Sequence, residues 1–301
     1  MRFIPSTHMQ AGGCMSATAN GGVSGSFVSG SETYVYHEFK LSNRNVSETF
    51  LFTVEKGFTT RARFILIGGG GGGGFNGAGS YGLGGGGGGS DVIDYTGQLY
   101  TGDYQLRVGH GGLPAEPDDP ITPTYNGGDG DYTEVLGGPY VSTARLRAVG
   151  GDGGYGDNSV GSTYLHGGDS GNGNTGGSNF GNNAGGGAGF SSNGVNGTSA
   201  RAGNGGTGTT ITLPYSSPGW GGTSEAVGGG GGGSADSGDI QGTGTDGGGN
   251  GGRIDTGTGQ DGTRYTGGGG GGSANFASVP RDGTQGGDGI LIIYYPTGSC
   301  Y

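Results

Sequence analysis

The side chains that could carry acid–base, nucleophilic or metal chemistry are few in this sequence and lie far apart. The histidines are His8, His37, His110 and His166. None of them has the spacing to another histidine or to a cysteine that a zinc site requires. No serine lies in the Gly-x-Ser-x-Gly turn that joins a strand to a helix in many hydrolases. We therefore expect no enzymatic activity, no metal centre and no cofactor. Cys14 and Cys300 lie near opposite ends of the chain, either as free thiols or as a bridge between the termini.

Two glycine-containing patterns that bind phosphates or calcium are also missing. No lysine follows Lys56, so the glycine-rich part cannot form the GxxxxGK[ST] loop that cradles phosphates. The segment GGDGDYTEV (127–135) comes nearest to a calcium-binding nonapeptide. Its Asp131 is one place out of register, however, and the pattern does not repeat. Neither phosphate nor calcium binding is therefore expected.

Aromatic residues in the segments between glycine runs are the best candidates for a binding surface. These segments are rich in Tyr, Ser, Asn, Gly and Thr, a composition close to that of binding loops. In such loops rigid rings supply contact area and small polar groups supply hydrogen bonds. The alternative is that the segments only reverse the chain direction and that the single tryptophan packs as a lid. The candidate contact residues are Phe75, Tyr81, Tyr125, Tyr155, Tyr164, Tyr215, Trp220 and Tyr265.

Composition and charge limit the classes of partner. The net charge is −11, and the chain has no basic run, so nucleic acid is a poor electrostatic partner. No apolar stretch reaches the roughly 18 residues that a membrane-spanning helix needs. Only seven of the 87 glycines lie in residues 1–67. The remainder of the chain is therefore about one-third glycine, against about 7% in ordinary proteins.

Strand-like patterns predict an all-β fold. ETFLFTV (48–54), RARFILI (61–67), YQLRV (104–108) and TARLRAV (143–149) alternate apolar and other residues with a period of two. GILIIYY (289–295) is nearly all apolar, which is typical of a strand buried on both faces. No segment has the period and caps of a helix. These strands predict a β-sandwich whose last strand lies far from the others in sequence.

The same patterns predict how the chain is divided. We expect an extended arm or anchor over residues 1–30, sandwich strands with the first glycine runs over 31–149, a glycine-rich insertion over 150–288 and a closing sandwich strand over 289–301. An unstructured loop as long as this insertion would be unusual inside a compact domain. The insertion must therefore have its own order or be truly flexible.

Four long glycine runs suggest what that order is. They span residues 68–74, 84–89, 228–233 and 267–272. A threefold left-handed helix of the polyproline II type makes no internal hydrogen bonds, and six or seven residues of it span roughly 19–22 Å. Without Cβ atoms, such helices can pack side by side and bond laterally, which satisfies their backbone groups. We therefore predict a bundle of polyglycine II helices that displays the linking segments at its ends.

Several of these motifs resemble a family of glycine-rich domains in bacteriophage virion proteins. The shared pattern is ILIGGGGGGG, then GLGGGGGGS, then YQLRVGHGG, ending in GGDGILIIYY, over roughly residues 46–296. The sequence is also similar to the glycine-rich domain of anaplastic-lymphoma-kinase-type receptors and to phage tail-fibre tip adhesins. The resemblance implies a jelly-roll or TNF-like sandwich, often trimeric, on a fibre or tail.

From this resemblance we expect a non-enzymatic phage structural protein located in the virion. It would be a tail-fibre, tail-tip or head-fibre component with other virion proteins as partners. Its loops would bind a bacterial surface glycan or protein, and no nucleic acid or membrane insertion is expected. Two alternatives stay open at this point. One is a pure scaffold without receptor affinity, and the other is an ice-binding polyglycine II protein.

Overall fold

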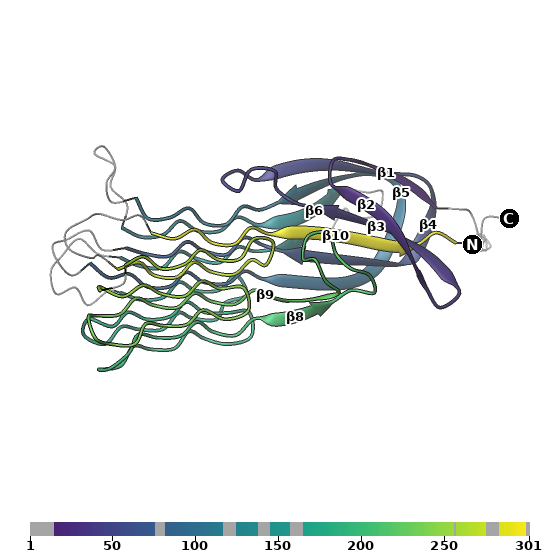
Figure 1. Cartoon of the computed structure of the whole chain (residues 1–301). Coiled ribbons are helices and arrows are strands. Elements are labelled where there is room, and N and C mark those ends of the chain that lie inside the picture. The colour runs from purple at the N-terminus through teal and green to yellow at the C-terminus, as the bar shows by residue number, and fades with distance from the viewer. Residues whose placement is uncertain are drawn as a thin grey trace, which may run out of the picture.

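The protein has two parts that lie end to end, a β-sandwich and a bundle of extended glycine-rich segments (Figure 1). The computed structural model describes residues 15–75, 82–116, 125–137, 145–156, 165–255, 257–274 and 283–298. Within these ranges the regular secondary structure is entirely β, which confirms the predicted all-β class. The described residues include no helix that could span a membrane.

Most strands belong to one bent antiparallel sheet. The strands are β1 (Ser16–Asn20), β2 (Val23–Ser29), β3 (Glu32–Phe39), β4 (Glu48–Ile67), β5 (Val92–Val108), β6 (Thr133–Gly137), β7 (Leu146–Ala148), β8 (Thr209–Thr212), β9 (Ser224–Val227) and β10 (Ile290–Pro296). The order in the main sheet is β2-β3-β10-β4-β5-β6-β7, and β1 pairs with β4. Strands β8 and β9 form a separate hairpin.

Bends in the long strands β4 and β5 fold this sheet into two layers. Their pairing is shifted between Val54 and Phe58 and again between Thr59 and Ala62. Such bulges bend a strand and increase its twist. The first half of β4 pairs with β1 and with the second half of β5. The second half of β4 pairs with β10 and with the first half of β5. The two strands therefore contribute to both layers of the sandwich.

Strand β10 lies between two apolar clusters, as its continuous apolar sequence predicts. Leu291, Ile293 and Tyr295 belong to the core between the two layers. Ile290, Ile292 and Tyr294 alternate with them and belong to a second cluster, which includes Ile211 of β8 and Val227 of β9. Because side chains alternate along a strand, a strand covered on both faces needs apolar residues at every position.

Two predicted segments contain more strand than their sequences indicated. Residues 16–29, expected within an extended arm over 1–30, form β1 and β2 and pair with β4 and β3. The insertion over 150–288 contributes the hairpin β8–β9. These strands are short and rich in Ser, Thr and Ala. Pairing with apolar neighbours orders them where their own propensity is weak.

The glycine segments hydrogen-bond to one another with a period of three. The N–H groups of Gly71 and Gly74 donate to the carbonyls of Gly88 and Gly85, at 2.8 and 2.9 Å. Gly69 and Gly72 donate to a second segment (128–131), and Gly70 and Gly73 donate to a third (284–287). Residues three apart therefore face the same neighbour, which is the pattern that a threefold extended helix gives.

Each long glycine run is surrounded by other backbone on all sides. The run 68–74 donates to the three segments just named and accepts from residues 151–154, from residues 270–273 and from Gly112. The runs 84–89, 228–233 and 267–272 likewise donate to at least three backbone segments, and each accepts from three. The segments approach so closely that a Cβ on Gly71 would lie 1.9 Å from the carbonyl oxygen of Asp152. The need for pure glycine therefore comes from close packing inside the bundle.

Candidate binding face at the distal end of the glycine bundle

The turns at the end of the bundle farthest from the sandwich form the candidate site (Figure 1). The chain leaves the sandwich after Ile67 and returns at Val92, and later segments run back and forth between the two ends in the same way. We call the described turns 179–183, 198–201 and 236–240 the distal face. Their positions are set by the glycine segments that they join, which bond laterally along their length.

The side chain of Asn183 holds the three turns of the distal face together. It is buried, with 3% of its surface exposed. Its Nδ2 donates to the carbonyl of Thr198 at 2.9 Å and to Asp239 Oδ2 at 2.8 Å. Its Oδ1 accepts from the backbone N–H of Asp236 at 3.2 Å. One buried amide thus joins turns that are far apart in sequence.

Backbone hydrogen bonds close the same turns. Phe180 and Asn183 exchange N–H to carbonyl bonds at 2.9 and 3.1 Å. Ile240 accepts from the N–H of Ala202 at 2.8 Å and donates to the carbonyl of Ala200 at 3.1 Å. With backbone and side-chain donors engaged in this way, the turns are held in one arrangement relative to the bundle.

The distal face presents apolar and polar groups to solvent. Phe180 is 58% exposed and Ile240 is 60% exposed. Asn182 donates to Asp236 at 2.8 Å beside them. No covalent chemistry follows from this set of side chains, but a rigid apolar contact next to amides and carboxylates suits recognition of a surface.

A separate group of carboxylates lies along the side of the bundle. Burial raises the pKa of Asp152, and the nearby charges of Asp129 and Asp169 raise it further. The side chain of Asp129 accepts from the N–H of Gly153 at 2.9 Å, so it serves the backbone packing. Among the described residues no group of His, Cys, Asp and Glu is arranged to hold a metal ion.

Comparison with known families places this chain. A model of the glycine-rich domain family matches residues 44–296. The chain belongs to this glycine-rich domain family. No curated protein matches it. The matched range includes the bundle and the strands from β4 onward, whereas β1, β2 and β3 precede it.

Some of the predicted contact residues lie near the distal end of the bundle. Tyr155 is 47% exposed, and its carbonyl accepts from Gly85 at 2.9 Å. Phe75 also lies there but is fully buried, and its N–H donates to the carbonyl of Tyr125 at 2.9 Å. Phe75 therefore packs inside the bundle end and cannot contact a ligand directly. Tyr81 and Tyr164 lie outside the described residues.

Three other predicted contact residues of the glycine-rich domain lie at the sandwich, far from the distal face. Tyr215 is buried and stacks on Tyr36 with ring centroids 4.0 Å apart. Trp220 donates from Nε1 to the carbonyl of Tyr265 at 2.9 Å and packs with it against the second apolar cluster. The alternative that Trp220 is a packed lid is therefore confirmed. The rings of these three residues cover β10, so they are not displayed together with the turns at the distal end.

Sequence reasoning missed Phe180 and Ile240. Each is a single apolar residue in a short polar turn, in SNFGNN and SGDIQG. An isolated apolar residue between turn-forming residues is a usable signal for an exposed contact. These turns are shorter than the aromatic-rich linking segments, so their composition alone does not indicate a contact.

Proposed function

We propose that this glycine-rich domain protein is a structural component of a bacteriophage particle and binds the bacterial surface through its distal face. It would stand in a tail fibre, tail tip or head fibre beside other virion proteins. We further propose that its glycine segments are polyglycine II helices and that the sandwich is of the jelly-roll or TNF-like kind and forms a trimer. The resemblance of the motifs ILIGGGGGGG, YQLRVGHGG and GGDGILIIYY to glycine-rich domains of phage virion proteins supports the virion role. The match to the glycine-rich domain family supports the domain type.

The observation that carries the adhesive role is the combination of exposure and rigidity on the distal face. A single exposed apolar side chain is ordinary on a protein surface. Phe180 and Ile240, however, stand on turns that the buried Asn183 fixes to one another. Groups that are already ordered before binding lose little conformational entropy when a ligand arrives. The distal face is thus suited to contact a host glycan or protein.

The bundle supplies the mechanical part of the proposal. Its segments bond laterally to neighbours on all sides, so bending it would break many backbone hydrogen bonds at once. A stiff body of this kind keeps the distal face at a fixed distance from the sandwich. The sandwich is left free to attach to the particle and to other copies of the chain.

The adhesive role is tested by binding to cells. Labelled protein is incubated with the host of the phage that encodes the chain, and bound label is measured by flow cytometry. Wild-type protein is expected to bind saturably, and the double variant Phe180→Ala, Ile240→Ala to bind at least about tenfold more weakly, since each buried apolar side chain contributes roughly 1.5–3 kcal/mol. The double variant Val28→Ala, Leu51→Ala, which removes two exposed apolar side chains from the sandwich instead, is the control and should bind as wild type.

Two further measurements separate the alternatives. If purified particles of that phage lack the chain in mass spectrometry, the virion role is excluded. If the chain is present but the wild-type protein ignores host cells, the adhesive role is excluded and a pure scaffold remains. Thermal hysteresis of the same protein at micromolar concentration would instead favour the ice-binding hypothesis.

A further inference from the structure

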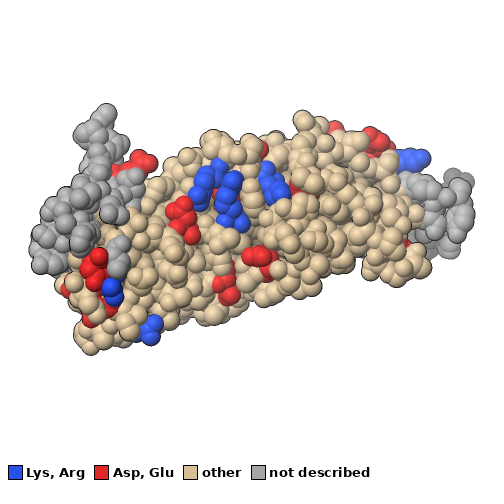
Figure 2. Space-filling view, in the orientation of Figure 1, with Lys and Arg blue, Asp and Glu red and all other residues tan. Residues whose placement is uncertain are grey.

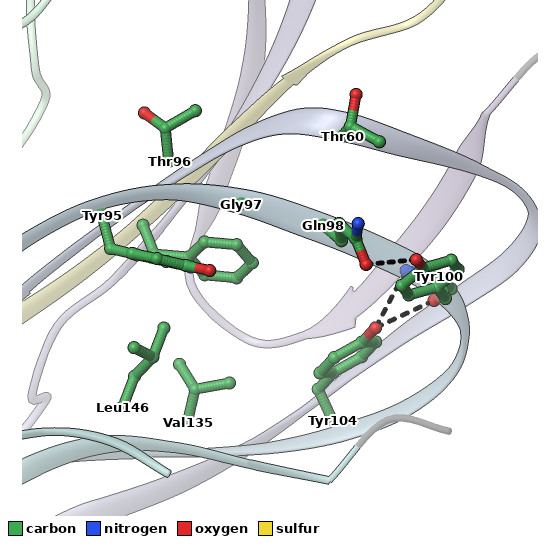
Figure 3. A pocket seen from close by; sticks show the side chains of 10 residues that line it. Thr60, Tyr95, Thr96, Gly97, Gln98, Tyr100, Tyr104, Val135 and Leu146 are labelled. Atoms are coloured by element: carbon green, nitrogen blue, oxygen red, sulfur yellow. Dashed lines mark hydrogen bonds between the residues drawn. The ribbon is translucent and has the colours of Figure 1, made fainter. Parts of the chain in front are cut away.

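The open edge of the sandwich contains a pocket that is separate from the distal face. Its volume is about 610 Å³, within the range of about 300–1,000 Å³ that is usual for small-molecule sites. It lies between the first half of β5, which belongs to one layer, and β6 and β7, which belong to the other. Val135 and Leu146 form its floor and face Tyr95 across the pocket (Figure 3).

A fixed bend in β5 forms one end of the pocket. The hydroxyl of Tyr104 donates to the carbonyl of Tyr100 and accepts from its N–H, both at 3.0 Å. One side chain thereby closes the backbone at the point where the pairing of β4 and β5 is shifted. Figure 3 shows these two bonds at the edge of the pocket. The pocket is therefore part of the folded framework, because a bulge that is clamped in this way keeps its shape.

The ring of Tyr95 is held in place although it is 47% exposed. It packs against Phe64 with ring centroids 6.3 Å apart. On its other side it lies over the backbone of Gly97, where a Cβ would come within 2.2 Å of the Tyr95 ring. Glycine at position 97 thus leaves room for the ring of Tyr95, two positions earlier on the same strand. An exposed aromatic face that is supported on two sides is preorganised for stacking.

Charge decides which class of ligand fits. The described residues that line the pocket are all uncharged, in a chain with a net charge of −11. The carboxylates elsewhere on the surface would repel an anion, and the described lining has no carboxylate to pair with a cation. Figure 2 likewise shows a surface that is mostly free of charged side chains. The ligand class that fits is therefore neutral.

The lining also requires a ligand with one apolar face and a polar rim. Tyr95, Phe64 and Leu146 supply apolar surface. At the rim, Gln98 accepts a hydrogen bond from the Tyr100 hydroxyl through Oε1, which leaves its NH₂ group able to donate. The Tyr95 hydroxyl adds a group that can donate or accept. A pyranose ring has C–H groups on one face and hydroxyls around its edge, so it matches both requirements.

We propose that this pocket binds one pyranose ring of a neutral saccharide, stacked on Tyr95 and hydrogen-bonded at Gln98. It is a second binding site at the side of the sandwich. It does not depend on the distal face and would stand even if that face bound nothing. A neutral glycan that lies along the protein could therefore be held at two places.

The experiment uses the full chain and simple methyl glycosides. Amide chemical shifts of uniformly ¹⁵N-labelled protein are followed while methyl α-glucoside, methyl β-galactoside or methyl N-acetyl-β-glucosaminide is added up to about 50 mM, which detects dissociation constants in the millimolar range. Saturable shifts at the amides of Gly97 and Gln98 with at least one of the three are expected. Tyr95→Ala should weaken that binding about two- to tenfold, since a good aromatic contact contributes roughly 0.5–1.5 kcal/mol and 1.4 kcal/mol corresponds to about a factor of ten.

Two variants keep the result interpretable. Gly97→Ala keeps the Tyr95 ring but displaces it, and should weaken binding as Tyr95→Ala does. Val28→Ala is the control, because Val28 is an exposed side chain on β2 that does not line the pocket, so sugar binding should be unchanged. The proposal is overturned if none of the glycosides shifts these amides. It is also overturned if the only compound that shifts them is an anionic sugar, N-acetylneuraminic acid, or an apolar ring without hydroxyls, toluene. Shifts there that follow protein dilution instead of sugar would assign the pocket to a contact between copies, and would also overturn it.

Discussion

The N–H of Gly71 donates to the carbonyl of Gly88 at 2.8 Å, although the two residues belong to segments that run in opposite directions. This bond is one of many that replace the internal hydrogen bonds of a helix or the regular ladder of a sheet. Neighbouring segments can come this close only because neither carries a side chain at the contact. A Cβ on Gly87, next to Gly88, would lie 2.2 Å from the carbonyl oxygen of Gly71.

A single methyl group inside the bundle should therefore destabilise the protein. Gly71→Ala is expected to lower the free energy of unfolding by about 3 kcal/mol, the upper end of typical overpacking effects, because backbone on both sides must move. Gly222→Ala is the control, since its Cβ would meet nothing closer than the Ser224 carbonyl at 3.9 Å. Chemical denaturation of the two variants checks this. Equal midpoints for both variants would contradict the close packing.

The amide of Asn183 should be necessary for the rigidity of the distal face. Asn183→Ala leaves the N–H of Asp236 and the carboxylate of Asp239 without this partner, and each lost buried bond costs about 1–3 kcal/mol. Hydrogen exchange of residues 198–201 and 236–240 should become faster while exchange in the sandwich stays unchanged. Asn179→Ala is the control, because Asn179 is half-buried on the same turn and its side chain donates within that turn, to the carbonyl of Gly181 at 3.3 Å, so exchange of the other turns should be unaltered. If these residues exchange at the same rate in wild type and in Asn183→Ala, the amide does not fix the turns.

The buried His37 should make stability depend on pH. Burial lowers the pKa of His37 from 6.5 to about 4. The ring lies 2.7 Å from the Ser24 hydroxyl and 3.1 Å from the Tyr295 hydroxyl, so it is held in its neutral form. Because the unfolded chain binds the proton more readily, this stabilisation is fully present above about pH 6.5 and is lost as the pH falls towards 4.

The expected loss is up to about 3 kcal/mol over that interval, from the size of the pKa shift. It is measured by urea denaturation at several pH values in wild type and in His37→Gln. The carboxylates titrate in both proteins, so the difference between them isolates the histidine. Parallel curves for the two proteins would mean that His37 is protonated as readily in the folded state as in the unfolded one.

An ion pair at the junction of bundle and sandwich should matter more than one at the surface. Asp288 has a side chain that is fully buried, and its Oδ2 accepts from Arg264 Nε at 2.8 Å. Removing the arginine leaves a buried carboxylate without its counter-ion, which typically costs about 3–5 kcal/mol. Arg264→Ala should therefore unfold at much lower denaturant concentration than wild type. Arg61→Ala, which breaks an exposed pair with Glu32, should unfold at the same denaturant concentration as wild type. Equal shifts of the midpoint for the two variants would contradict a larger contribution from the buried pair.

The strands of the sandwich were largely predictable, because side-chain alternation is written in the sequence. RARFILI and GILIIYY lie in β4 and β10 as expected, and β10 is buried on both faces. The strands β1 and β2 were not predicted, since their short sequences, SATAN and VSGSFVS, gain their order from the neighbours with which they pair. The pocket beside Tyr95 was equally hidden, because a bulge in β4–β5 depends on pairing between distant residues.

The candidate site was predictable only in part. Tyr155 lies near the distal end as expected, whereas Trp220 and Tyr265 are packed on the sandwich. The sequence shows that an aromatic residue lies in a segment between two glycine runs. It does not show at which end of the bundle that segment lies. This depends on whether the preceding segment runs towards the sandwich or away from it.

By itself the sequence determined that the chain is all-β and that its glycine runs need neighbours without side chains. The reason is local: alternation and the absence of Cβ are properties of the residues themselves. Tertiary structure alone decided which segments become neighbours, and therefore which turns share the amide of Asn183 and which rings cover β10. Identical glycine backbones can bond to one another in many registers, and only the packing of the whole molecule selects one.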